Sequence, residues 1–285
     1  MYKQAVVFSL LFILLIASGC GKSTAATNSS PSSLSLPAEK FVMAGSGANI
    51  PVTAKLIEAY QSKTGVPIEI PGSIGSNGAV NAVRAGSLEL GLISRPLTAE
   101  ETSAGLKAIP YARIAVVFAG HEEVPDSAIS SDEVLAVLQG TKTTWANGAK
   151  MYVYIREPSD SGNLELYSQL PGYKDSLADA IANQRWQVIY RDSDMGDVMA
   201  KTKGAFGLIN MLEVARSGGR IKPLELDGVA PTPANVASGR YRPVLTLSFL
   251  FKGELTSRSA AFVEYAQSGE ARRIMEQAGA VPTGR

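Results

Sequence analysis

The sequence has very few residues of the types that bind metals or form disulfides. Its 285 residues include one cysteine, Cys20, and one histidine, His121. A single cysteine excludes disulfides within the chain, and these two residues cannot supply the ligands of a Cys/His zinc site. A Ser-His-Asp hydrolase would depend wholly on His121, which lies in the polar stretch AGHEEVPD and is expected to be solvated there. The composition therefore gives little support to an enzyme of either kind.

An excess of either charge is also absent. The chain has 27 Lys and Arg against 26 Asp and Glu, which gives a net charge of +1, and it has neither a basic block nor an acidic tail. This balance argues against a general nucleic-acid binder. Apolar residues make up 45% of the chain, so a sizeable core is expected. A chain of this length can form one large domain or two lobes of about 100 to 150 residues each.

A hydrophobic run long enough for a membrane span is missing. The apolar stretch from Ala5 to Ala17 follows Lys3, and its thirteen residues fall short of the about 20 that a span needs. A basic flank, a short apolar core and small residues are typical of a secretory signal. The small residues end in ASGC, which resembles a bacterial lipobox, with Ala17 where leucine is usual, and implies that Cys20 is lipidated. A soluble export signal with an incidental Cys20 is the alternative.

The segment after Cys20 is polar. Residues 21–37 contain eight Ser or Thr and no large apolar cluster. Such a segment cannot bury enough surface to offset its ordering entropy. We therefore expect a lipoprotein signal peptide at residues 1–19 and a flexible tether at residues 20–37, which together place an anchored domain outside the cytoplasm.

From Phe41 onwards, short apolar strands alternate with helices. The first helix is expected to have Asn49 as its N-cap, Pro51 near its start and Gly65 at its end. Strands are expected at KFVMAG, VPIEI, LELGLIS, RIAVVFAG, MYVYIRE, RWQVIYRD, FGLIN and VLTLSFLF. This alternation predicts an α/β fold with largely parallel sheets.

Three polar loops join strands to helices: GSGAN (45–49), GSIGSNG (72–78) and PSDSGN (158–163). Each offers glycine backbone with Ser or Asn side chains, and each opens a helix whose first N–H groups lack internal partners. These donors and the positive end of the helix dipole favour an anion, and such loops gather at the carboxyl ends of strands. Helix capping is the alternative for any single loop, but two of the three have an arginine nearby.

These motifs, in this order, resemble the extracytoplasmic phosphate-binding proteins of bacterial ABC uptake systems. The resemblance runs from about Phe41 to Arg285 and is carried by AGSGANIP, GSIGSNGAVNAVRAGSLELGLISRPLTAEE, SSDEVLAVLQGTKTTW, REPSDSGN and RPVLTLSFLFKGE. It implies an α/β, two-lobed periplasmic-binding-protein-like (type II) fold with two hinge crossovers that closes on its ligand. Lobe 1 is expected at residues 38–112 and 242–285, and lobe 2 at residues 113–241.

The resemblance also implies which residues bind the ligand. Arg156 supplies a charged fork, Arg95 adds a second positive group or is only a surface arginine, and the others supply neutral donors. Asp160 is expected to pair with Arg156 and hold it in place. The expected ligand-binding residues are Ser46, Asn49, Ile50, Ser76, Asn77, Ser94, Arg95, Arg156, Ser161, Gly162 and Asn163. No catalytic residue, metal ligand or cofactor is expected.

Two features depart from the family pattern. The third loop is one residue longer than usual, which leaves the register of Ser159 and Asp160 open. The acidic residue usual after the GLIS strand is replaced by Ser94-Arg95. In the family, that carboxylate accepts a hydrogen bond from protonated phosphate, and sulfate, which is fully ionised, has no proton to donate.

The resulting hypothesis is a monomeric, non-enzymatic receptor, held on the membrane by a lipid on Cys20. It captures phosphate or a similar tetrahedral oxyanion outside the cytoplasm and delivers it to an ABC permease. One alternative keeps the fold but makes the protein a ligand-dependent sensor or surface partner. Another is an exported phosphatase, for which the sequence supplies neither a metal cluster nor a convincing nucleophile–base pair.

Overall fold

The computed structural model describes residues 41–284, which belong to one compact unit. The expected signal peptide, tether and lipidated Cys20 lie outside the described residues. Within residues 41–284, the structure contains no helix that is both long enough and apolar enough to span a membrane.

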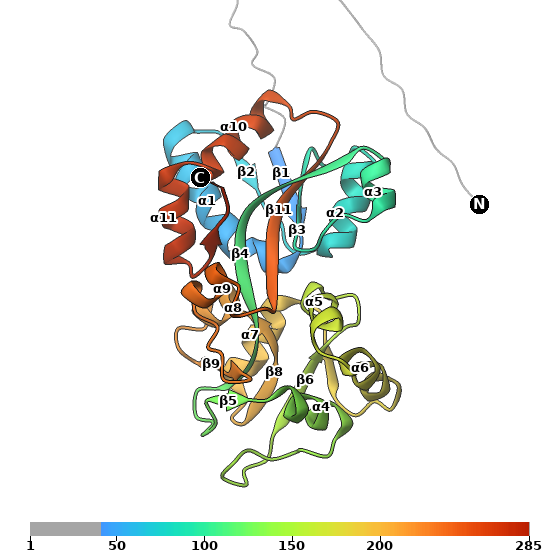
Figure 1. The fold of residues 1–285 in the computed structure, drawn as a ribbon. Coiled ribbons are helices and arrows are strands. Elements are labelled where there is room, and N and C mark those ends of the chain that lie inside the picture. The colour runs from blue at the N-terminus through green and yellow to red at the C-terminus, as the bar shows by residue number, and fades with distance from the viewer. Residues whose placement is uncertain (1–40, 285) are drawn as a thin grey trace, which may run out of the picture. The chain divides into compact units, whose positions relative to one another are not determined.

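The described part is a mixed α/β structure in which helices flank a large sheet (Figure 1). Its strands are β1 (Phe41–Gly45), β2 (Ile68–Glu69), β3 (Leu90–Ile93), β4 (Leu106–His121), β5 (Ala128–Ile129), β6 (Tyr152–Arg156), β7 (Gln187–Ile189), β8 (Ala205–Asn210), β9 (Ile221–Pro223), β10 (Glu225–Leu226), β11 (Val244–Lys252) and β12 (Val281–Pro282). Its helices are η1 (Gly47–Asn49), α1 (Ile50–Thr64), α2 (Gly75–Arg84), α3 (Ala99–Ser103), α4 (Ser131–Gln139), α5 (Ser161–Gln169), α6 (Tyr173–Ala182), α7 (Asp192–Lys201), α8 (Met211–Arg216), α9 (Pro233–Ser238), α10 (Ser257–Ala266) and α11 (Gly269–Gln277).

The long strand β4 belongs to two groups of strands. Residues 106–115 of β4 pair with β11, and residues 116–120 pair with β8. We call β2-β1-β3-β11-β4 the first sub-sheet and β4-β8-β6-β7, with β9, the second sub-sheet. Figure 1 shows β4 running from the first sub-sheet into the second. The predicted lobe boundaries fall close to this change of partner, and the division into lobes stays a prediction.

Strand directions agree with the sequence only in part. As predicted, β1 runs parallel to β2 and β3, and β6 runs parallel to β7 and β8. The strand β4, however, is antiparallel to β11 and to β8. The chain enters the second sub-sheet along β4 and comes back to pair with β4 along β11, so these two strands must run in opposite directions.

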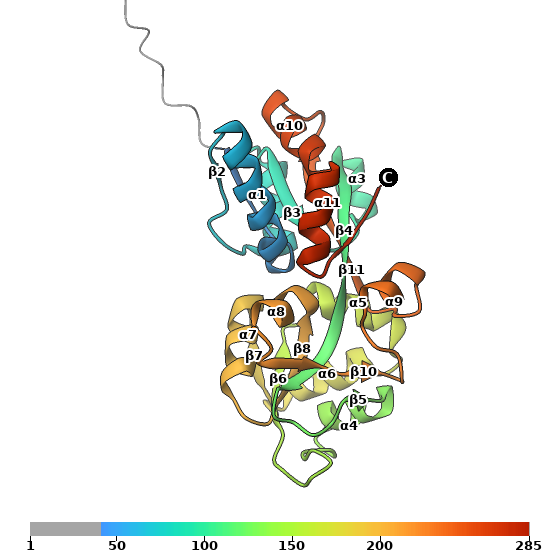
Figure 2. The same cartoon turned by 90° about the vertical axis from the view of Figure 1, so that its left-hand side faces the viewer.

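The first sub-sheet packs its apolar face against α1, α10 and α11, which lie together in Figure 2. Helix α1 buries Val52, Leu56 and Tyr60 at helical spacing and ends at Gly65, where φ is 72° as a left-handed cap requires. In the sheet, the rings of Tyr111 and Phe249 stack with centroids 4.3 Å apart. This core fixes the loops that follow β1 and β3.

The environment predicted for His121 is wrong. Its exposed fraction is 2%, because it is the last residue of β4 and pairs with Ile221 of β9. The polar residues that follow His121 suggested a loop, but the apolar strand before His121 extends as far as the histidine.

Candidate functional site

The three polar loops meet between the two sub-sheets, as the sequence predicted. Ser46 follows β1, Ser76 lies in the first turn of α2, and Ser161 opens α5. Ser94, after β3, donates from its Oγ to Ser161 Oγ at 2.9 Å and lies 2.6 Å from Ser46 Oγ. The backbone N–H of Ser94 donates to Ser76 Oγ at 3.2 Å, and Ser76 Oγ is 3.4 Å from Ser161 Oγ. Four hydroxyls from both sub-sheets therefore form one cluster.

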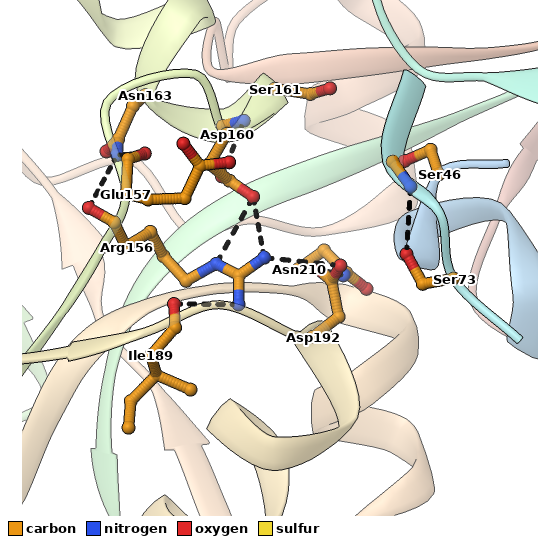
Figure 3. Close-up of polar contacts among 12 residues, drawn as sticks. Ser46, Ser73, Arg156, Glu157, Asp160, Ser161, Asn163, Ile189, Asp192 and Asn210 are labelled. Atoms are coloured by element: carbon orange, nitrogen blue, oxygen red, sulfur yellow. Dashed lines mark hydrogen bonds and ion pairs between the residues drawn. The ribbon is translucent and has the colours of Figure 1, made fainter. Parts of the chain in front are cut away.

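Arg156 ends β6 beside this cluster, and its side chain is 5% exposed. Its Nε and one terminal nitrogen donate to Asp160 Oδ2 at 3.2 and 2.7 Å, which confirms the predicted pairing. The other terminal nitrogen donates to the backbone oxygen of Ile189 at 3.2 Å. Figure 3 shows the guanidinium with Asp160 on one side and Asp192 on the other. The distance from Arg156 to Asp192 Oδ2 is 3.4 Å.

Asp192 was not predicted as a site residue. It opens α7, its side chain is 16% exposed, and its Oδ1 accepts a hydrogen bond from Asn210 at 3.0 Å. Burial raises the pKa of Asp192 to about 6, against the lowering effect of Arg156, and the charges of Asp160 and Glu213 act with burial. A poorly solvated carboxylate thus lies at the site beside the arginine.

A sequence signal for Asp192 existed. The stretch RWQVIYRD was read as a strand, and the helix that follows it was not predicted. Met195 and Met199, four residues apart, are both fully buried, and Asp192 and Asp194 lie in the first helical turn. Apolar spacing of this kind with acidic residues at the start indicates a helix N-terminus.

These groups line a cavity of about 350 Å³ between the sub-sheets. We call Ser46, Gly47, Ser73 and Ser76 the first bank, because they come from the loops of the first sub-sheet. Arg156, Asp160, Ser161 and Asp192 come from the second sub-sheet and form the second bank. Figure 3 shows Ser46 and Ser73 across from the second bank. A smaller cavity of about 20 Å³ adjoins Ser46, Arg156, Asp160, Asp192 and Asn210.

The two banks also come close to each other at Gly47. A methyl group built on Gly47 would lie 2.3 Å from Asp192 Oδ2 and 3.3 Å from Ser73 Oγ. Glycine at this position therefore lets the carboxylate of Asp192 reach the loop after β1.

Three predicted residues have their side chains engaged away from the cavity between the banks. Asn49 occupies the N-cap position of α1, as predicted, but its side chain caps no N–H of the helix. Its Nδ2 donates to Tyr111 Oη at 3.0 Å and to Ile93 O at 3.3 Å. Asn163 donates to the backbone oxygens of Arg156 and Glu157 at 3.1 and 2.8 Å. Ile50 lines a neighbouring cavity of about 380 Å³. Their roles in ligand binding stay predictions.

Arg95 forms an ion pair with the carboxylate of Glu101. Its two terminal nitrogens donate to Glu101 at 2.7 and 2.9 Å, and Asn77 Oδ1 accepts from the same guanidinium. The pairing with Arg95 lowers the pKa of Glu101 to about 2. The charge of Arg95 is thus balanced within the first sub-sheet, beside a cavity of about 740 Å³ that Ser94 also lines.

The two remaining predicted residues lie at the cavities. Asn77 lines the cavity between the banks. The backbone N–H of Gly162 donates to Asp160 Oδ1 at 2.9 Å, and Gly162 lines the smaller cavity. Within residues 41–284, no group of three or more His, Cys, Asp or Glu residues is placed to hold a metal ion.

Known proteins share this architecture. Residues 23–270 match the PBP superfamily domain. The chain belongs to the PBP superfamily. It is 24% identical to the phosphate-binding protein PstS of Bacillus subtilis, over 99% of this chain and 95% of that protein. A putative phosphate ABC transporter substrate-binding protein of Clostridium perfringens, solved with bound phosphate, has a TM-score of 0.76 at 24% identity, over 86% of this chain and 100% of that one.

Binders of another oxyanion share the fold as well. The periplasmic molybdate-binding protein of Azotobacter vinelandii has a TM-score of 0.60 at 12% identity, over 86% of this chain and 100% of that one. These likenesses confirm the predicted α/β, periplasmic-binding-protein-like fold.

Proposed function

We propose that this PBP-superfamily protein is an extracytoplasmic receptor that captures phosphate and delivers it to an ABC permease. The observation that carries the proposal is the buried Arg156 facing serine hydroxyls from both sub-sheets at one cavity. Relatives named as phosphate-binding proteins support the choice of phosphate.

The chemistry of the two banks suits a tetrahedral oxyanion. Hydroxyls act as donors and acceptors, so Ser46, Ser76 and Ser161 can exchange their bonds to one another for bonds to ligand oxygens. Arg156 adds a charged donor that is already held in place by Asp160 and the oxygen of Ile189. A ligand bound by both banks would hold the two sub-sheets together, which is how a receptor signals occupancy to a partner.

The protein acts by binding, and we assign it no catalytic step. We also propose that a lipid on Cys20 anchors it, that residues 20–37 form a tether, and that the receptor works as a monomer with lobes at the predicted boundaries. A ligand-dependent sensor with the same site remains the competing role, and the identity of the partner distinguishes the two.

Calorimetric titration of the purified protein with phosphate, arsenate, sulfate and molybdate tests the ligand. The protein is first unfolded and refolded so that no carried ligand masks binding. We expect phosphate affinity at about the micromolar level or tighter. Absence of binding to all four anions would overturn the proposed function.

Co-purification from membranes tests the role. A permease captured by the phosphate-loaded protein supports the transport receptor. Capture of a signalling protein, without a permease, would favour the sensor.

A further inference from the structure

We infer that Asp192 selects for oxyanions that carry a proton, by accepting a hydrogen bond from the O–H of the bound ligand. The inference rests on the proposed function, since it assigns a specificity residue to the same cavity. It names a ligand class, phosphate and arsenate, over sulfate and molybdate.

The hydrogen bonds of the two carboxylates single out Asp192. Both oxygens of Asp160 accept hydrogen bonds of ordinary length, Oδ1 from Gly162 N–H and Oδ2 twice from Arg156. The Oδ1 of Asp192 accepts from Asn210, but its Oδ2 has within residues 41–284 only the 3.4 Å contact with Arg156. A carboxylate oxygen can accept two hydrogen bonds, so Oδ2 retains acceptor capacity.

The position of Asp192 Oδ2 allows it to accept a hydrogen bond from a ligand in the cavity between the banks. Asp192 Oδ2 lies against Gly47 of the first bank. Asp192 lines the cavity of about 350 Å³ between the banks, and also the adjoining cavities of about 20 and 380 Å³. The amide of Asn210 holds the other oxygen at 3.0 Å. A ligand between Ser46 and Arg156 would therefore meet an acceptor that is already oriented.

The charges at the cavity favour the same conclusion. Arg156 is balanced by its two hydrogen bonds to Asp160, and Glu157 and Arg191, which also line the cavity, carry opposite charges. The first bank is uncharged, so Asp192 adds a negative charge. Sulfate and molybdate present only ionised oxygens, which Asp192 repels. Phosphate and arsenate carry an O–H near neutral pH and turn the same contact into a hydrogen bond.

Asp192 also supplies the carboxylate that the loop after β3 lacks. Ser94 and Arg95 occupy the positions where the family resemblance leads one to expect an acidic residue, and the carboxylate of the first sub-sheet, Glu101, is paired with Arg95. In this chain the carboxylate comes from the opposite side of the cavity, at the start of α7.

The selectivity should depend on pH. The charged groups at the cavities beside Asp192 are Arg156 at the end of β6, Glu157 after it, Asp160 before α5, Arg191 before α7 and Glu213 of α8. The first bank faces Asp192 with Gly47 and Ser73. With a pKa of about 6, Asp192 is ionised above that pH and protonated below it. Protonated Asp192 donates a hydrogen bond, so the rejection of sulfate should weaken as the pH falls through about 6.

The test compares Asp192→Asn with Asp194→Asn, which removes the same charge from the same helical turn at an exposed position. Phosphate and sulfate are titrated into each purified protein at about pH 7.5 and about pH 5. We expect Asp192→Asn to lower the phosphate-to-sulfate affinity ratio at least about 10-fold at the higher pH, mainly because its affinity for sulfate increases. Asp194→Asn should keep the parent ratio.

The outcomes separate this inference from the proposed function. If the parent protein binds phosphate and Asp192→Asn keeps its ratio, the inference is wrong and the proposed function stands. If the parent binds no oxyanion, the proposed function itself fails. Should Asp192→Asn not fold, the parent decides through sulfate, which stays fully ionised at both pH values. A sulfate affinity that rises toward pH 5 supports the inference, and a constant sulfate affinity overturns it.

Discussion

The two banks of the cavity differ in the kind of contact that they offer. The first bank presents uncharged groups, the hydroxyls of Ser46, Ser73 and Ser76 and the backbone of Gly47. The second bank carries the charges, with Arg156 between Asp160 and Asp192. Hydroxyls adapt to any tetrahedral oxyanion because they donate or accept, whereas fixed charges distinguish one protonation state from another. We therefore propose that both banks contribute to affinity, and that the second bank determines selectivity.

Removing the cation of the second bank should have the largest effect. Arg156→Ala leaves Asp160 and Asp192 without their shared partner, and we expect a loss of stability of about 3–5 kcal/mol. Phosphate binding should weaken by about 2 kcal/mol or more, roughly 30-fold. Denaturant unfolding and calorimetry measure the two effects.

Arg185→Ala is the matched control for Arg156→Ala. Like Arg156, Arg185 forms an ion pair, with Asp179. Arg185 is not among the residues that line the cavity between the banks. Phosphate affinity that is unchanged in Arg156→Ala would remove Arg156 from the site.

The next effect comes from forcing the banks apart. Gly47→Ala places a methyl group against Asp192 Oδ2, and overpacking of this kind costs about 1–3 kcal/mol. We expect lower stability together with weaker phosphate binding. Gly269→Ala is the control, because a methyl group there meets no atom within 4 Å. Equal losses in both variants would contradict the close contact between Gly47 and Asp192.

A smaller effect is expected on the stability of the ligand-free protein. The pKa of Asp192 is raised from its ordinary 3.8 to about 6, so its contribution to stability is full below about pH 4 and is lost as the pH rises through about 6. Asparagine does not titrate. The stability of Asp192→Asn relative to the parent should therefore increase by about 1–2 kcal/mol between about pH 4 and about pH 7. Urea unfolding at a series of pH values measures it, and a difference independent of pH would contradict the raised pKa.

The smallest effect should come from the first bank. Ser76→Ala removes one hydroxyl, and we expect phosphate binding to weaken by about 1 kcal/mol. Because a neutral donor does not distinguish protonation states, sulfate binding should weaken by the same factor. Ser168→Ala, at an exposed position of α5, is the control for titrations with both anions. A change in the phosphate-to-sulfate ratio in Ser76→Ala would break the division of roles between the banks.

Local patterns predicted much of the fold. Period-two and helical spacing located the principal strands and α1, and Gly65 ends that helix as expected. The convergence of the three loops followed from a general property of strands and the helices after them. The pairing of Arg156 with Asp160, predicted together with the third loop of the family motif, is present in the structure.

The contact between Asp192 and Arg156 was not predicted. Asp192 is 36 residues from Arg156, and only the pairing of β6 with β7 brings them together. Asn49 and Asn163 were predicted as ligand-binding residues from the family resemblance, and that role stays a prediction. The hydrogen bonds of their side chains to Tyr111 and Tyr173 were not predicted. Sequence alone does not show which partner a buried amide will satisfy.

The central place of β11 has a consequence for the order in which the chain folds. This strand pairs with both β3 and β4, yet it comes from residues 244–252, close to the end of the chain. A nascent chain that stops before β11 leaves the edges of β3 and β4 open, and open edges invite pairing with other chains. The pairing of β4 with β8 needs only residues up to 210. The pairing of β4 with β8 can therefore form during synthesis, while the first sub-sheet is complete only after residue 252 has emerged.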